Sequence, residues 1–391
     1  MTLQKNTGVF AAGLALFSMF FGAGDLIWPL ILGGQTGSAT FYSMLGLLIT
    51  GVSLPLIGCL AMMLFRGDYR KFFGRLGTFP GFCVLFLVQA ILGPFGSIPR
   101  LITLSYATLR PYLFDVIGPM LFSVLSCIVI FLFLSKKQRL IDILGYILTP
   151  ILLLSLVFIF VLGFFNAPEP LAMGYTNGEA FSEGLKVGYN TLDIVASFIF
   201  AAFVMTYFHR EGEDLNNPIQ KKRIFGKMLK SSFLAAALLA GMYIGLTHIA
   251  ASYTPLLPPE HAPEERLALV SLHLLGPYGG FVSCIAVTMA CLTTAISITA
   301  VVSDYIKTDL LKEKGGRNLP ILITLGISAL LANIGFMGIA KMLGPILTIL
   351  CPGLIVLSVL NILHRLYEMK LGKLAVFAAF AVTTILGLWI L

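Results

Sequence analysis

Long apolar runs separated by short polar segments extend along the whole chain, and this pattern predicts a bundle of membrane-spanning helices. The runs reach about 20 residues or more, the length that a helix needs to cross the hydrocarbon core of a bilayer. The first run is too long for the apolar part of a signal peptide and has no small-residue cleavage site, so we expect it to remain in the protein. Eleven spans are predicted, at residues 9–32, 41–65, 79–108, 116–135, 140–165, 184–208, 228–253, 279–305, 319–336, 343–364 and 374–391.

The distribution of positive charge supports this assignment. All but five of the 26 Lys and Arg residues fall on the N-terminal segment and on every second loop. The exceptions are Arg100, Arg110, Lys186, Arg266 and Lys341. By the positive-inside rule, the basic loops and the N-terminus are expected on the cytoplasmic side. An odd number of spans then places Leu391 on the outer side.

Composition excludes a water-soluble globular protein. Hydrophobic residues make up 58% of the chain and charged residues 11%, and the mean hydropathy is +0.95. The net charge of +8 belongs to the short loops, so no nucleic-acid partner is expected. The six cysteines lie in or beside apolar runs without paired spacing, and we interpret them as small buried hydrophobic residues. No phosphate-binding glycine loop is found, so ATP is not an expected partner.

The first predicted span contains a segment, Phe20–Pro29, that is unfavourable for a continuous membrane helix. Gly22 and Gly24 weaken the helix because glycine loses much backbone entropy when it is ordered. Pro29 removes an N–H donor, and Asp25 places a carboxyl group at membrane depth, where an unpaired charge is costly. Such groups are tolerated where they line a cavity or bind a ligand. We predict a broken helix that holds an ion or a substrate; a kink around a neutral Asp25 is the alternative.

The sixth span is interrupted in a similar way. It combines glycine, small polar residues and an acid within an apolar run, from Gly184 through Gly188–Asp193 to Ser197. The two interrupted spans are five apart, so two five-span units would lie inverted relative to each other in the bilayer. Glycine-interrupted segments in both halves of a chain point to the central site of a secondary transporter.

The eighth span carries small and hydroxyl residues at Ala290, Thr293, Thr294 and Ser297. One interpretation is that they let helices approach closely. The other is that the hydroxyl oxygens, with carbonyl groups freed by a broken helix, form the oxygen shell that a sodium ion needs.

A single arginine lies in the third span. Arg100 is expected either to form an intramembrane ion pair or to extend its side chain toward the membrane surface. Asp25 and Asp193 are the candidate partners, and the sequence does not choose between them.

Four segments together resemble the branched-chain amino acid:cation symporter family, the BrnQ-type carriers: Phe21–Pro29, Gly93–Arg100, Gly188–Asp193 and Ala290–Ala295. The resemblance implies a single all-α transporter domain over 1–391, with a fold like that of the leucine transporter. Its five-plus-five inverted repeat would comprise residues 9–165 and 184–364, with 374–391 as an extra helix. It also implies import of leucine, isoleucine, valine or similar hydrophobic amino acids across a bacterial inner membrane by alternating access, with Na⁺ or H⁺ as the coupling ion and no other cofactor.

The resemblance also implies roles for individual residues. A sodium site would use backbone carbonyls and hydroxyl groups of Ser18, Phe21, Ala290, Thr293 and Thr294. The freed N–H groups from Ala23 to Asp25 would receive the substrate carboxylate, and groups from Tyr189 to Asp193 would receive its ammonium. The substrate-binding set is Phe21, Gly22, Ala23, Gly24, Asp25, Tyr189, Asn190, Asp193 and Phe198.

The chain departs from the family pattern at Asp25, where the family usually has Asn. A carboxylate at this position repels the carboxylate of a substrate unless it is protonated or neutralised by a cation. This departure favours coupling to protons or a shifted substrate preference.

Two other functions are compatible with part of the sequence. Residues 22–25 fit the Gly-x-Gly-Asp pattern of intramembrane aspartyl proteases, in which Asp193 would supply the second carboxyl group. A passive channel is the other alternative, although the repeated rings or carbonyl filter typical of a pore are not found.

Overall fold

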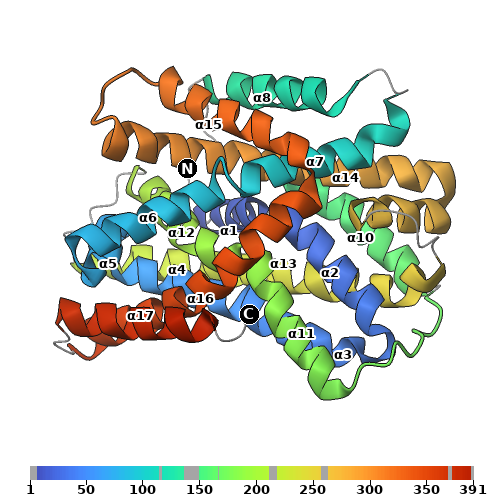
Figure 1. Ribbon diagram of the computed structural model, residues 1–391, viewed down its shortest axis with the longest axis horizontal. Coiled ribbons are helices and arrows are strands. Elements are labelled where there is room, and N and C mark those ends of the chain that lie inside the picture. Colours follow the sequence, from blue (N-terminus) through green and yellow to red (C-terminus); the bar gives the residue numbers. More distant parts are fainter. Residues whose placement is uncertain are drawn as a thin grey trace.

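Helices follow the predicted apolar runs through the chain (Figure 1). The computed structural model describes residues 7–113, 117–135, 149–165, 167–210, 218–256, 263–368 and 372–388, and no strand occurs among them. The helices are α1 (Thr7–Phe20), α2 (Ala23–Thr36), α3 (Thr40–Leu48), α4 (Leu54–Leu64), α5 (Tyr69–Phe73), α6 (Thr78–Leu92), α7 (Ser97–Leu109), α8 (Pro119–Ser135), α10 (Thr149–Phe165), α11 (Asn177–Asn190), α12 (Asp193–Arg210), α13 (Pro218–Tyr253), α14 (Arg266–Tyr305), α15 (Asn318–Leu331), α16 (Phe336–Leu366) and α17 (Lys373–Leu388).

Every one of the eleven predicted segments overlaps at least one of these helices. By length and composition, five helical stretches in the described residues are able to cross a membrane, or six if the bent pair α11 and α12 counts as one span. Short π-helical turns extend two of the stretches, at Ile49–Ser53 and Ile306–Leu310. The all-helical membrane fold is confirmed, and the number of spans stays a prediction.

The two interruptions predicted from the sequence are present as breaks in the helices. The first lies between α1 and α2, where Gly22 has an extended backbone at φ −125° and ψ −154°. The second lies between α11 and α12, which are bent by 43°. Leu192 in this second break has φ 74°, a left-handed conformation that costs a residue with a side chain about 1–2 kcal/mol. Such strained positions are concentrated at functional sites.

A third break was not predicted. The span expected to be continuous over 79–108 is divided, because α6 ends at Leu92 and α7 begins at Ser97. Pro94 cannot donate a backbone hydrogen bond, and the Phe95 N–H bonds back to the Ala90 carbonyl instead. The helix is therefore interrupted next to the segment that carries Arg100.

The breaks in spans one and six lie against each other. A Cβ atom added at Gly24 would be 2.9 Å from the carbonyl oxygen of Thr191, so only glycine permits this approach. Glycine also brings α11 against α3, since a Cβ atom at Gly184 would overlap the Ser43 carbonyl oxygen. Small residues allow this kind of close backbone packing in membranes.

The contacts between helices can be compared with the predicted relation between spans one to five and spans six to ten. Span one packs on span seven (α2 on α13), and its counterpart is span six on span two (α11 on α3), as Figure 1 shows. Likewise, span five packs on span eight (α10 on α14), and span ten packs on span three (α16 on α7). These pairings are consistent with the predicted five-plus-five repeat, whose boundaries stay a prediction.

Large apolar side chains face outward on the helices at the periphery. Phe79 on α6, Leu154 on α10 and Leu374 on α17 are each more than 70% exposed. Polar side chains such as Thr36, Thr247 and Thr324 are buried inside, where their hydroxyl groups bond to carbonyl groups of their own helices. This inversion of the soluble pattern is that of a multi-pass membrane protein.

Candidate functional site

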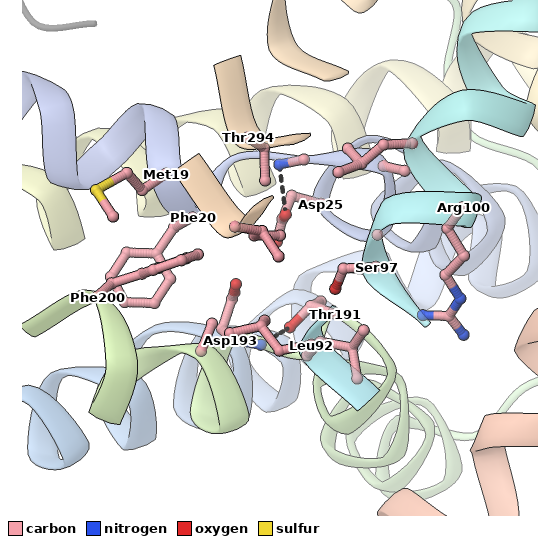
Figure 2. Close-up of a pocket in the computed structure, with 17 residues that line it drawn as sticks. Met19, Phe20, Asp25, Leu92, Ser97, Arg100, Thr191, Asp193, Phe200 and Thr294 are labelled. Carbon is pink, nitrogen blue, oxygen red and sulfur yellow. Dashed lines mark hydrogen bonds between the residues drawn. The ribbon is translucent and has the colours of Figure 1, made fainter. Parts of the chain in front are cut away.

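A small cavity lies where the three helix breaks meet α14. Figure 2 shows Asp25 and Asp193 on two sides of it, with Phe20 and Phe200 at one end and Ser97 and Arg100 at the other. Five residues of the predicted substrate-binding set line this cavity: Gly22, Ala23, Gly24, Asp25 and Asp193. The polar groups therefore come from segments that are far apart in the chain.

The carboxyl group of Asp25 occupies the N-terminal end of α2. Asp25 is the third residue of this helix, and its Oδ2 accepts a hydrogen bond of 2.7 Å from the Gly22 N–H. Its side chain is 1% exposed. Because a helix N-terminus favours an anion, this contact stabilises the carboxylate. The chain's own carboxyl group thus lies at the helix N-terminus, next to the Ala23–Asp25 N–H groups that were expected to receive the substrate carboxylate.

Asp25 and Asp193 are joined by a tyrosine that the sequence analysis did not identify. The Tyr243 hydroxyl on α13 bonds to Asp25 Oδ1 and to Asp193 Oδ2, the second at 2.6 Å. All three side chains are at most 1% exposed. A phenol has one proton to donate, so both contacts are hydrogen bonds only if one of the two carboxyl groups is itself protonated. The geometry therefore requires an additional proton in this cluster.

A signal for Tyr243 exists in the sequence. A tyrosine near the middle of a membrane span needs a hydrogen-bond partner for its hydroxyl group. The partner was not predictable, because it lies on helices about 50 and 218 residues away.

The residues of the predicted sodium site lie together between α1 and α14. Thr294 Oγ1 is 2.8 Å from the Ser18 carbonyl oxygen and 3.0 Å from that of Phe21. Thr293 Oγ1 is 2.9 Å from the Ala290 carbonyl oxygen and 3.5 Å from that of Ser18. The set offers only neutral oxygen atoms, which suit a hard monovalent cation. Binding a cation here requires the Thr294 hydroxyl to turn its proton away from the two carbonyl groups.

Arg100 forms neither of the arrangements expected for it. Its side chain is 1% exposed, so it does not reach the membrane surface. The salt bridges found among the described residues join other partners, all outside this cavity. Arg100 Nη1 instead donates to the Asn190 carbonyl oxygen at 3.1 Å, and the guanidinium lies 5.4 Å from the ring centre of Phe336. The expected ion pair is therefore absent from this arrangement of the described residues.

Four residues of the predicted substrate-binding set lie outside the cavity lining. The Phe21 ring stacks on Phe17, with ring centres 5.2 Å apart, although its carbonyl belongs to the sodium-site set. Tyr189 and Asn190 are partly buried at the end of α11. The fourth, Phe198, packs away from the cavity.

The prediction that Phe198 contributes to the pocket is wrong in this structure. Its ring packs against Phe72 and Phe73 of α5, with ring centres 5.1 and 5.7 Å apart. Phe200 lines the cavity instead, because it lies two helical turns after Asp193 and so shares that face of α12. The sequence indicated an apolar wall but not which side of α12 forms it.

The rest of the lining is mainly apolar. Phe20 belongs to the segment that was predicted to break the first span. Its ring packs edge-to-face with that of Phe200, and the ring centres are 5.3 Å apart. The other apolar lining residues are Met19, Leu92, Leu101, Leu192, Ala196 and Ile298. The cavity thus joins an apolar end to a charged end, as binding of a small amphipathic molecule requires.

The fold is shared with transporters of known structure. The substrate-bound outward-open state of a Na⁺-coupled sialic acid symporter matches 97% of this chain and 88% of its own, with a TM-score of 0.63 and 14% identity. The inward-facing conformation of Mhp1 matches 98% of this chain and 88% of its own, with a TM-score of 0.65 and 13% identity. At these identities the likeness establishes the fold, which is that of the leucine transporter.

Sequence comparisons are more specific. A branched-chain amino acid permease, BrnQ, of Bacillus subtilis (strain 168) is 31% identical over 352 residues, covering 87% of this chain and 77% of that protein. A putative branched-chain amino acid carrier protein of Staphylococcus aureus (strain USA300) is 29% identical over 378 residues, covering 90% and 80%. The family model described as branched-chain amino acid transport protein matches residues 5–390. The chain therefore belongs to the branched-chain amino acid transport protein family.

Proposed function

We propose that this amino acid transporter imports leucine, isoleucine, valine or a similar hydrophobic amino acid together with Na⁺ or H⁺. The observation that carries the proposal is the cavity at the paired helix breaks, where apolar and charged walls face one another. A branched aliphatic side chain would lie against Phe20 and Phe200, and the charged groups of the amino acid would lie between Asp25, Asp193 and Arg100. Between two substrates that differ by one methylene group, an apolar wall of this kind changes the binding free energy by about 1–3 kcal/mol. Several related amino acids would therefore share the site.

Sodium coupling is favoured by the oxygen cluster around Thr294. Its oxygen atoms come from α1, the turn before α2, and α14, so a bound ion would hold the first break against the second repeat. A ligand shifts a conformational equilibrium only by its difference in affinity for the two states. Sodium at this position would stabilise the conformation in which α1 and α14 are together.

Proton coupling is favoured by the cluster of Asp25, Tyr243 and Asp193. Its hydrogen bonds account for one proton beyond the phenol's own. Release of that proton would leave two buried carboxylates competing for one donor, which is unfavourable at membrane depth. Proton binding at this cluster would thus be linked to the arrangement of α2, α12 and α13.

The proposed location is the inner membrane of a bacterium, with the N-terminus and the basic loops on the cytoplasmic side. The cavity is narrow, so a substrate of leucine size requires the surrounding helices to move apart. Alternating access would supply this movement through the breaks.

The proposal is tested by uptake of labelled leucine into proteoliposomes. An inward sodium gradient and an outside-acid proton gradient are imposed separately, each with isoleucine and valine as competitors. We expect accumulation above the external concentration with at least one gradient, and inhibition by both competitors. Equilibration without accumulation would instead indicate a passive channel. Tyr243→Phe should abolish most proton-driven uptake if protons are the coupling ion, and should leave sodium dependence in place if they are not.

The protease alternative is set aside. The family model and the similar proteins from Bacillus and Staphylococcus are transporters, so the chain is not an enzyme. Asp25 and Asp193 do approach each other, as that hypothesis required, but they belong to a transporter's central cavity.

A further inference from the structure

Two acidic side chains and one basic side chain line the cavity. Their positions decide where the ammonium and carboxylate groups of an amino acid would bind. The N-terminus of α2 was expected to receive the substrate carboxylate. Asp25 now occupies that position through the Gly22 N–H. A second carboxylate beside Asp25 and Asp193 would be repelled in a site from which water is excluded. The part of the cavity beside the two aspartates therefore favours a cation.

Arg100 is the cationic side chain of the cavity lining, and most of its donors have no partner. Its single protein acceptor is the Asn190 carbonyl oxygen, reached from Nη1. Nε and Nη2 have no hydrogen-bond partner although the side chain is 1% exposed. Buried donors without acceptors are costly, and a buried guanidinium without a counter-charge is more so. This position therefore lacks an acceptor, and specifically an anionic one.

A carboxylate is the ligand that matches these free donors. The guanidinium presents its N–H groups in a planar fork that binds both oxygen atoms of a carboxylate. Asp25 is near enough for its charge to act on Arg100, yet no salt bridge joins the two side chains. The space between the acidic pair and Arg100 is the place for a molecule that carries both charges.

The order of groups along the cavity agrees with a single orientation of an amino acid. Figure 2 shows Phe20 and Phe200 at one end, the two aspartates in the middle, and Arg100 beyond Ser97 at the other end. An aliphatic side chain belongs at the first, an ammonium group at the second and a carboxylate at the third.

We propose that Arg100 binds the α-carboxylate of the transported amino acid, while the ammonium group is received on the side of Asp25. The inference rests on the proposed function, because it takes the substrate to be an amino acid. It reverses the orientation implied by the family resemblance, which placed the carboxylate on the N–H groups of α2. Arg100 would then select for a free carboxylate, and the acidic pair for a free amine.

The test compares leucine with leucinamide, which keeps the amine and the side chain but has no carboxylate. Binding of each is measured on purified protein as the ligand-induced shift of the melting temperature over a concentration series. We expect the wild type to prefer leucine, and Arg100→Gln to reduce the ratio of the two affinities by about tenfold or more. Arg100→Lys, which keeps the charge but loses the fork, should give an intermediate ratio.

Arg110→Gln is the matched control. Arg110 follows the other end of α7, is exposed and does not line the cavity, so its substitution should leave the ratio unchanged. If Arg100 only supports the second break through Asn190, both ligands should weaken equally in Arg100→Gln and the ratio should stay at the wild-type value. An unchanged ratio, or equal loss of both ligands in the two Arg100 variants, would overturn the assignment.

The same measurements distinguish failure of the proposed function from failure of the assignment of Arg100. If the wild type shows neither leucine binding nor leucine uptake, the proposed function fails and the inference fails with it. If the wild type binds and accumulates leucine while Arg100→Gln keeps its preference over leucinamide, the inference about Arg100 alone is wrong.

Discussion

Tyr243 holds together the two acidic residues on which the candidate site is built. It reaches from α13 to Asp25 on α2 and to Asp193 on α12, and so connects three helices in the interior. The Thr294 hydroxyl has a comparable role on the other side of the first break, where it bonds to the carbonyl groups of Ser18 and Phe21. At the scale of single residues, side chains thus satisfy both the acidic pair and the free backbone groups of the first break: Thr294 bonds to its carbonyl groups, and Asp25 accepts from the Gly22 N–H.

The Thr294 contact leads to a prediction about ion dependence. Thr294→Ala removes one of the proposed sodium ligands, so the sodium concentration for half-maximal leucine uptake should rise by about tenfold. Thr324→Ala is the control, since Thr324 is also fully buried but bonds only within α15, to the Pro320 carbonyl. The measurement is sodium-dependent uptake in proteoliposomes with matched protein content. An identical sodium response in Thr294→Ala and the wild type would remove Thr294 from the ion site.

At the scale of elements, the two broken helices determine where chemistry is possible. The α1–α2 break and the α11–α12 break touch at Gly24 and Thr191. Each break exposes backbone donors and acceptors that a continuous helix would use internally. The third break, between α6 and α7, places Ser97 and Arg100 at the same cavity. Three separate defects in three helices therefore form one site.

The close contact between Gly24 and Thr191 predicts that the two breaks do not tolerate a side chain at position 24. Gly24→Ala places a Cβ atom 2.9 Å from the Thr191 carbonyl oxygen, and backbone atoms on both sides must shift to accept it. We expect a loss of stability of about 1–3 kcal/mol and a larger loss of uptake, because the breaks are pushed apart. Gly241→Ala is the control, since no atom lies within 4 Å of a Cβ atom there on the exposed side of α13. The experiment compares melting temperatures and uptake rates; equal behaviour of the two variants would contradict the packing argument.

At the scale of the whole molecule, the two repeats are also joined outside the cavity. Arg70 on α5 makes a two-point contact with Asp309, with Nε to Oδ1 at 2.8 Å and Nη2 to Oδ2 at 3.0 Å. Asp309 lies in the π-helical turn after α14 and also accepts from the Thr308 hydroxyl at 2.9 Å. The contact connects the loop after span two to the end of span eight, on the side expected to face the cytoplasm. It holds this side of the two repeats together in the conformation described.

Breaking this contact should favour opening toward the expected cytoplasmic side. Arg70 is 59% exposed at its side chain, so the pair contributes only about 0–1 kcal/mol. We therefore expect Asp309→Asn to raise the rate of leucine efflux from loaded proteoliposomes by no more than about fivefold. The double variant Arg70→Asp with Asp309→Arg should return the rate toward the wild type. A rate that is unchanged in Asp309→Asn would mean that the pair does not limit opening.

The sequence by itself determined two of the three helix breaks, those between α1 and α2 and between α11 and α12. Gly22, Gly24 and the glycines before Asp193 act through the backbone of their own segment, so their effect needs no knowledge of neighbours. Membrane burial also followed from composition alone, because apolar runs of about 20 residues have few other stable environments. The cation-site residues were implied by the family resemblance, and their contact between α1 and α14 depends on the tertiary packing.

Only the tertiary structure decided which side chains complete the site. Tyr243 joins the two aspartates, Phe200 replaces Phe198 on the cavity wall, and Arg100 lies at one end of the cavity without a carboxylate partner. These outcomes depend on how each helix is rotated and which helices are adjacent. Rotation and adjacency are set by packing between segments far apart in the chain, and an apolar membrane helix with a weak amphipathic pattern carries little information about its own facing.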